Sequence, residues 1–316
     1  MGQQLYLRKW QLTIETWRGD TITIPDNRVQ SGQAQTIGDL RVTFRIEKNW
    51  SQIMQFGEIV IYNLNKNTET DIFKNAKTVT LEAGYEEGPF GLIFKGFVRQ
   101  PIRGKEDATT YFLKLICIDG DDALNLGFAS LTLAENQTAQ QIIQSIARSS
   151  TVPFDVRVDG PLTQQATTRS KTIFGQAVDA IRSVAINNNA GFFVDNGQAK
   201  VTPLNKAPTG NIPQLNANTG MVGIPFQVDQ GVQVRSLLNP LFTMGEWLRL
   251  NNASIILAEL EIGQLQTLLD ADGIYRIIEI HYTGDTRGND WYVDMLCIGQ
   301  AGALPTLLAD PNQNGI

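Results

Sequence analysis

The residues best suited to chemistry in this chain are one histidine, two cysteines and a few clustered carboxylates. His281 lies in the apolar segment 277–282, and Cys117 and Cys297 each lie in an apolar segment of their own. Nucleophilic catalysis needs a base beside an activated serine or cysteine, and none of them here has a motif such as G-x-S-x-G around it. The three residues also lack a recognisable ligand spacing for zinc. We therefore expect no catalytic residue, cofactor or metal, and two buried thiols.

The carboxylates cluster at Asp119, Asp121 and Asp122, and again at Glu86 and Glu87. A glycosidase needs two carboxylates that face each other across a cleft, roughly 5 to 9 Å apart, and neighbours on one turn do not supply that geometry. Neither the calcium pattern D-x-[DN]-x-[DN]-G nor the phosphate loop G-x-x-x-x-G-K-[ST] occurs. The sequence therefore predicts a protein that is not an enzyme. A protein that binds or hydrolyses cell-wall glycans stays open as the alternative.

Length and charge restrict the remaining classes. A chain of 316 residues is long enough for about two domains, with three possible. The formal net charge is −6 and the basic residues form no runs, so a nucleic-acid-binding surface lacks its usual electrostatic footprint. The negative charge does not exclude a chain that lines a pore for DNA, because an acidic surface would repel phosphate and leave the DNA free to slide. The first ten residues hold no signal-peptide-like apolar run, and no segment reaches the roughly 18 apolar residues of a membrane span. We expect no membrane anchor and synthesis in a cytoplasm.

An internal repeat is the strongest pattern along the chain. Residues 111–118 align without a gap on residues 291–298, an offset of 180 (291 − 111 = 180), and Gly104 then falls on Gly284. A weaker echo relates residues 57–63 to residues 245–251, which share a Gly-Glu start and an Asn end. A chance match between two apolar strands is the alternative. Internal repetition predicts one small β-domain used at both ends of the chain.

The elements that would position these residues follow from periodicity. Alternation with period two predicts strands throughout residues 1–120, and residues 40–47 give the clearest case. Between the repeats the period changes: Thr138 is a candidate N-cap for a helix over residues 139–148, and a second helix is expected over residues 174–187. A hairpin turning on Asn196 and Gly197 follows.

These elements predict a mainly β fold, in which two similar small β-barrel domains flank a small α/β domain. The expected boundaries are 1–120 for the first barrel, 121–205 for the α/β domain, 206–300 for the second barrel and 301–316 for a loosely attached tail. Residues 255–269 fit either a helix or a strand.

Five tryptophans are spread through the two β regions, and aromatic residues are enriched at the energetic centres of interfaces. Core packing is the alternative for each of them. Trp50 stands in a polar run beyond a predicted strand end, so it is the residue we select as a possible interface contact.

The order barrel, α/β insert, barrel resembles the baseplate hub proteins of contractile-tailed bacteriophages. The resemblance is carried by residues 40–49, 58–64, 83–85 and 94–98 near the amino terminus, and by residues 273–277, His281, residues 284–288 and Trp291 near the carboxyl terminus. It covers nearly the whole chain and rests on patterns rather than on a catalytic signature. Similar proteins occur in R-type bacteriocins and as the amino-terminal part of VgrG spikes of type VI secretion.

The resemblance implies a structural role in the virion. Hubs of this kind form a homotrimeric, nearly sixfold ring that joins the hexameric tail tube to the trimeric central spike, contacts neighbouring baseplate proteins and lines the DNA channel without specific binding. A duplicated domain suits a ring that must satisfy both symmetries. The chain has no obvious lysozyme domain or β-helical needle, which is a departure from VgrG. A phage origin and a bacteriocin or type VI-like injection machine both stay open.

Overall fold

The computed structural model describes residues 7–25, 40–51, 54–120, 127–162, 166–204, 212–228, 231–257, 269 and 272–299. The chain divides into two compact units. The first unit joins both ends of the chain and comprises Met1–Asn49, Phe56–Ile118 and Thr209–Ile316, and the second comprises Trp50–Gln55 and Asp119–Pro208. The four-part division expected from the sequence stays a prediction. No helix among the described residues is long and apolar enough to cross a membrane.

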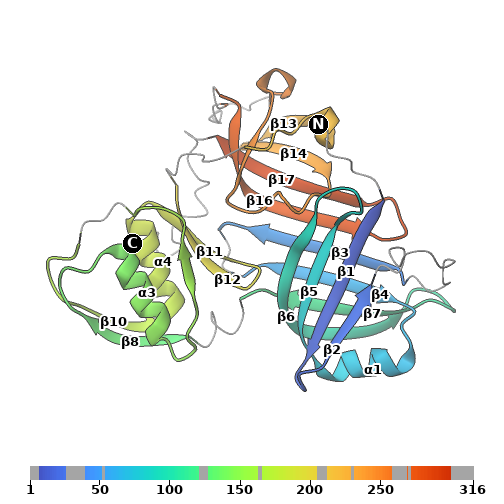
Figure 1. Cartoon of the computed structure of the whole chain (residues 1–316), viewed down its shortest axis with the longest axis horizontal. Coiled ribbons are helices and arrows are strands. Elements are labelled where there is room, and N and C mark those ends of the chain that lie inside the picture. The colour runs from blue at the N-terminus through green and yellow to red at the C-terminus, as the bar shows by residue number, and fades with distance from the viewer. Residues whose placement is uncertain are drawn as a thin grey trace, which may run out of the picture. The chain divides into compact units, whose positions relative to one another are not determined.

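The first unit is built on one antiparallel 12-stranded sheet with the order β13-β14-β17-β16-β3-β4-β7-β6-β5-β1-β2, and β15 pairs with β16 off this path (Figure 1). Its strands are β1 (Arg8–Thr16), β2 (Thr21–Pro25), β3 (Val42–Asn49), β4 (Phe56–Tyr62), β5 (Ala76–Tyr85), β6 (Phe90–Lys105), β7 (Tyr111–Ile118), β13 (Met221–Val228), β14 (Gly231–Leu237), β15 (Trp247–Arg249), β16 (Ile274–Asp285) and β17 (Trp291–Gly299). Strands from the two ends of the chain therefore lie side by side, where β16 meets β3.

In the part of this unit that the structure describes, three short helical elements accompany the sheet. They are α1 (Lys66–Asn75), η2 (Ala217–Thr219) and η3 (Asn252–Ser254). The side chain of Asn65 accepts a hydrogen bond from the backbone N–H of Asn67 at 2.9 Å, which satisfies one of the unpaired donors at the start of α1. Ile72 is the buried residue of that helix, as expected for one apolar face.

Alternation along each strand separates a buried face from a polar face. On β3, Val42, Phe44 and Ile46 are buried, as the sequence pattern predicts, while Thr43, Arg45 and Glu47 point to the opposite side. The same alternation runs along β7 and β17. One face of the sheet therefore carries the core, and the other carries most of the charged side chains.

The mainly β class is confirmed, but the predicted closed barrels are wrong. The strands of the two ends share one open sheet, and its outermost strands, β13 and β2, do not pair with each other. Closing a barrel requires every strand to have two strand neighbours, which a row of strands with two free ends does not provide. Instead, the strands of the two repeats join in one sheet through the pairing of β16 with β3.

The described residues of the second unit form two small sheets and two helices. Its elements are β8 (Phe128–Leu133), α3 (Ala139–Ser149), β9 (Val156–Val158), β10 (Lys171–Gln176), α4 (Ala177–Asn187), β11 (Ala190–Asp195) and β12 (Gln198–Pro203). β8 pairs with β10, and β11, β12 and β9 form a three-stranded sheet. Ile142, Ile143 and Ile146 of α3 and Ile181 of α4 are buried in one apolar cluster.

Two local sequence predictions in this unit are confirmed, and the predicted start of the second helix is wrong. Thr138 caps α3 through a capping box with Gln141, as its position predicts. Asn196 and Gly197 have φ angles of 55° and 80°, as a type I′ turn requires. The second helix, however, begins at Ala177, and Phe174 lies in β10. Residues 121–126, 258–268 and 301–316 lie outside the described residues, and so do the predictions that fall on them.

Candidate assembly site

The residues selected for chemistry do not meet at one place. His281 lies on β16, and its Nε2 is 2.6 Å from Oε1 of Glu279 on the same strand. This hydrogen bond raises the pKa of His281, and partial burial opposes the rise. Cys117 and Cys297 are free and buried, as predicted. Burial raises the pKa of Cys117 to about 12 and also raises that of Cys297, so neither thiol ionises near neutral pH.

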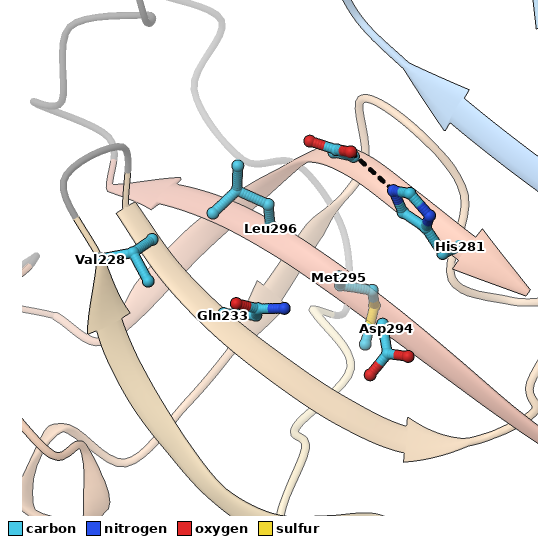
Figure 2. A pocket seen from close by; sticks show the side chains of 7 residues that line it. Val228, Gln233, His281, Asp294, Met295 and Leu296 are labelled. Carbon is cyan, nitrogen blue, oxygen red and sulfur yellow. Dashed lines mark hydrogen bonds and ion pairs between the residues drawn. The ribbon is translucent and has the colours of Figure 1, made fainter.

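A pocket of about 330 Å³ adjoins His281 on the polar face of the sheet (Figure 2). It is lined by Val228, Gln233, Glu279, His281, Asp294, Met295 and Leu296. Its two carboxylates already have partners: Asp294 accepts from Arg235 at 2.6 and 3.0 Å, and Glu279 contacts His281. The lining residues include no Ser, Thr, Cys or Lys that could act as a nucleophile. Among the described residues, no three His, Cys, Asp or Glu side chains are placed to hold a metal ion.

Trp50 does not lie where a partner could contact it. Its side chain is 1% exposed, its ring centroid is 4.8 Å from that of Phe193, and Gly191 lies directly beneath it. A Cβ atom at residue 191 would stand 1.7 Å from the indole nitrogen, so only glycine fits there. Core packing, the alternative for this tryptophan, accounts for its position within the chain, and the interface contact stays a prediction.

The internal repeat is visible as two hairpins of the same design. In the first hairpin, β6 carries a β-bulge opposite the step from Ile116 to Cys117, and in the second, β16 carries one opposite the step from Leu296 to Cys297. The two steps are again 180 residues apart (296 − 116 = 180). Because a bulge disturbs the ladder at one defined residue, its recurrence at the same place supports true equivalence of the hairpins.

The strands around the hairpins extend the equivalence. β7 pairs with β4 and β17 pairs with β14, with Gly57 opposite Cys117 and Val232 opposite Cys297. β14 therefore corresponds to β4, whereas the segment 245–251 forms β15, which pairs with β16 instead. The Gly-Glu echo seen in the sequence does not mark equivalent strands. The sheet contains the row β13-β14-β17-β16 followed by the row β3-β4-β7-β6.

Backbone strand pairing and side-chain hydrogen bonds hold the two rows together. Residues 279–285 of β16 pair with residues 43–49 of β3. At one end of this ladder the Arg41 guanidinium donates to both carboxylate oxygens of Asp285, the shortest distance being 2.7 Å. Arg8 donates to the backbone carbonyls of Asp285 and Gly288 at 3.1 and 2.6 Å. We call Arg8, Arg41 and Asp285 the junction cluster.

Electrostatics favour the charged form of the carboxylate in the junction cluster. Burial by itself would raise the pKa of Asp285, but hydrogen bonds from Arg41 and from the backbone N–H groups of Arg287 and Gly288 hold it below its ordinary value. No sequence pattern predicts this cluster. Arg41 and Asp285 stand 244 residues apart (285 − 41 = 244), and nothing local signals that the strands carrying them are neighbours.

Solved structures similar to this fold include two tail proteins and a type VI secretion component. The chain is similar to the 43 kDa tail protein of prophage MuSo2 from Shewanella oneidensis, with a TM-score of 0.56, 10% identity and coverage of 93% of this chain and 100% of that one. A tail protein of Neisseria meningitidis MC58 gives a TM-score of 0.55 at 9% identity over 92% and 96% of the chains. At such identities the likeness establishes the fold alone.

A third similar structure is the c3393 protein of E. coli, described as a type VI secretion component that resembles the T4 bacteriophage tail proteins gp27 and gp5. Its TM-score is 0.54 at 10% identity, over 88% of this chain and 79% of that one. No curated protein matches the sequence. The fold class is thus that of phage tail and type VI proteins.

The sequence itself identifies the family. Residues 21–256 match the family described as Baseplate hub gp41, and the chain belongs to it. The family assigns the protein a baseplate hub role and places it in the tail baseplate of a virion. The resemblance to baseplate hubs noted in the sequence is confirmed.

Proposed function

We propose that this hub is a homotrimer that joins the hexameric tail tube to the trimeric central spike of a contractile tail. The observation that carries the proposal is the repetition of a four-stranded row within one sheet, β13-β14-β17-β16 and then β3-β4-β7-β6. Three chains with two such rows each present six similar units and still obey threefold symmetry. A closed ring of that kind can match a sixfold neighbour on one side and a threefold neighbour on the other.

The polar face of the two rows suits the wall of a channel. Its ion pairs are Arg45 with Glu47 at 2.6 Å, Lys114 with Glu58 at 3.0 Å, Arg235 with Asp294 at 2.6 Å and His281 with Glu279 at 2.6 Å. Each acidic group on this face is thus opposed by a basic one nearby. A wall whose charges neutralise one another does not accumulate the unpaired cations that hold a phosphate backbone. In the proposed ring this face lines the lumen, and DNA passes without specific binding.

The partners and the chemistry follow from the same proposal. The spike, the tube and neighbouring baseplate proteins contact the ring through surfaces rather than through a catalytic pocket, and the hub itself is not an enzyme. It is made in the cytoplasm of the host bacterium and incorporated into the virion. A phage tail is the setting favoured by the family, and a bacteriocin or type VI-like machine would use the same ring.

The mass of the purified hub in solution, alone and co-expressed with the spike protein, tests this function. We expect a trimer, or a monomer that becomes a three-to-three complex with the spike, measured by native mass spectrometry. A hexamer would assign the chain to the tube. A monomer that ignores the spike and cleaves or binds peptidoglycan would support the glycan alternative and contradict the hub.

A further inference from the structure

The tip of the β11–β12 hairpin carries a sequence that is prone to deamidation. Asn196 and Gly197 form the turn between Asp195 and Gln198, and Gly197 is exposed to water. In an Asn-Gly pair the backbone nitrogen of the glycine can attack Cγ of the asparagine, because glycine has no side chain to hinder the approach. The residues that suit this turn therefore also give it a chemical weakness, unless the fold prevents the attack.

Deamidation at this turn would make and break defined bonds. A bond forms between the Gly197 nitrogen and Cγ of Asn196, and the bond from Cγ to the side-chain nitrogen breaks. That nitrogen leaves as ammonia, with the proton that the Gly197 N–H group gives up. Water then opens the succinimide ring at one of its two carbonyls and leaves aspartate or isoaspartate at residue 196. The attack thus needs a Gly197 nitrogen that can lose its proton and can approach Cγ.

The conformation of the turn keeps the two reacting atoms apart. The succinimide ring closes only when the Gly197 nitrogen and Cβ of Asn196 lie on the same side of the Cα–C bond. Asn196 and Gly197 have φ angles of 55° and 80°, which are values of a type I′ turn. In such a turn ψ of the first central residue is about +30°, the mirror image of a type I turn, so the nitrogen lies on the side opposite Cβ.

A buried carboxylate holds the attacking nitrogen in this position. The Gly197 N–H group donates to Oδ1 of Asp119 at 2.8 Å, and Asp119 is 1% exposed. Asp119 is itself fixed, since its backbone N–H group donates to the carbonyl of Gln55 at 2.9 Å. The turn cannot open toward the reactive conformation without breaking the hydrogen bond to Asp119, and breaking a hydrogen bond to a buried acceptor is costly.

Deamidation would damage the hairpin in two ways. An aspartate at residue 196 would add a carboxylate beside Asp195, which is 3% exposed and whose ion pair with Lys200 spans 2.9 Å. An isoaspartate would insert an extra carbon into the main chain, and a two-residue turn fixes the register of its strands only at its normal length. The register of β11 on β12 therefore depends on an intact Asn196.

We propose that Asp119 protects Asn196 from deamidation by holding the Gly197 nitrogen in this hydrogen bond. Asp119 stands 78 residues before Gly197, so the protection exists only in the folded unit and is lost when the hairpin tip opens. Asp119 acts here as a positioning residue. The inference goes beyond the hub function and does not depend on the proposed trimer.

Rates of deamidation in the full-length hub test the proposal. Peptide mass spectrometry after incubation at mildly alkaline pH follows the conversion of residue 196. In the folded hub we expect Asn196 to react on the order of a hundredfold more slowly than in the same chain unfolded in urea, because the reactive conformation then arises only by local opening. Asp119→Ala is expected to raise the rate in the folded hub on the order of tenfold, because the hydrogen bond that opposes opening is lost.

Two further variants separate this hydrogen bond from other effects. Asp119→Asn keeps an acceptor oxygen at the same place, so we expect a smaller increase in rate than for Asp119→Ala. Asp159→Ala is the matched control, since it removes another carboxylate beside the same hairpin, where Asp159 accepts from Oγ1 of Thr202 at 3.1 Å. It is expected to leave the rate at Asn196 unchanged.

Three results would overturn the proposal. Asn196 could react as fast in the folded hub as in urea. Asp119→Ala could react no faster than the parent, which would make the carboxylate a bystander, or more slowly, which would make it the base that activates the nitrogen. Asp159→Ala could raise the rate as much as Asp119→Ala, which would assign the protection to general stability.

Amide hydrogen exchange on the unaltered hub is a second measurement that needs no variant, and it decides the matter if Asp119→Ala does not fold. The Gly197 N–H group is expected to exchange on the order of tenfold or more slowly than an unprotected amide, because it is held by Asp119. Exchange at the unprotected rate would overturn the proposal.

Discussion

The two hairpins of the repeat share a bulge and a strand order, yet their tips have opposite surroundings. The tip of β16–β17 is enclosed by the junction cluster, with Trp291 at 1% exposure, whereas Tyr111 at the corresponding place on β6–β7 is 53% exposed. The difference arises from position in the sheet. β16 pairs with β3 as well as with β17, whereas β7 is the one described strand that pairs with residues 98–105 of β6, where Arg103 also contacts α1. The aromatic residue of one hairpin tip is thus buried, and that of the other tip is exposed.

The largest expected difference between the hairpins concerns their aromatic residues. Trp291→Ala removes a buried ring from between Phe44 and Arg8, so we expect it to reduce the free energy of unfolding by about 3–5 kcal/mol. Tyr111→Ala, at the equivalent exposed place, should cost under about 1 kcal/mol. Urea unfolding of the dilute, unassembled chain measures both. Equal costs for the two substitutions would mean that the hairpins are not in different surroundings.

The junction cluster gives the next effect in size. Asp285→Ala removes the hydrogen-bonded carboxylate of the part-buried Arg41 and leaves it Glu106, at 3.7 Å, so we expect a loss of about 1–3 kcal/mol in unfolding free energy. Asp294→Ala breaks a pair of similar geometry in which Arg235 is 54% exposed, so its loss should stay below about 1 kcal/mol. Thermal unfolding of both variants supplies the comparison. A larger effect for Asp294 would show that the junction cluster does not hold the two rows together.

The smallest effect depends on pH and is confined to the second hairpin. The pKa of His281 is raised above its ordinary 6.5 in the folded chain, so its contribution to stability is complete below pH 6.5 and is lost as pH rises through the folded pKa. In the parent chain we expect the free energy of unfolding to fall by under about 1 kcal/mol as pH rises through the folded pKa of His281, because the ring is part exposed. His281→Gln should remove this pH-dependent fall. The first hairpin has Ile102 at this place, with nothing to titrate.

Denaturation midpoints recorded from pH 6 upward in small steps would detect this effect. Glu279→Gln is the matched variant, since it removes the acceptor of the histidine proton and should abolish the same decline. A variant lacking His281 that declines like the parent would assign the pH dependence to another group.

The sequence predicts the parts of this fold that depend on near neighbours. Alternation places Val42, Phe44 and Ile46 on the core face, Thr138 marks the start of α3, and the match of residues 111–118 to residues 291–298 locates the equivalent hairpins. These features need only side-chain period, capping and short loops.

Local sequence patterns do not predict the features that depend on strands far apart in the chain. Apolar spacing extends the predicted second helix back to Phe174, but pairing with β8 holds residues 171–176 in a strand, and Gly175 has a φ of 144°. The barrels failed because the partner of β3 lies more than 200 residues away, on β16 (279 − 49 = 230). Trp50 stands in a polar run, yet Gly191 leaves space for its ring in the interior.

The sealed thiols have a consequence for the life of the particle outside the cell. In the proposed setting, a tail is assembled in a reducing cytoplasm and then released into aerated water, where oxidants attack ionised and accessible sulfur. Cys117 and Cys297 are neither, since both are buried and burial raises the pKa of each. We therefore expect the hub to age without forming mixed disulfides or sulfenic acids, and long storage in air to leave its cysteine chemistry unchanged.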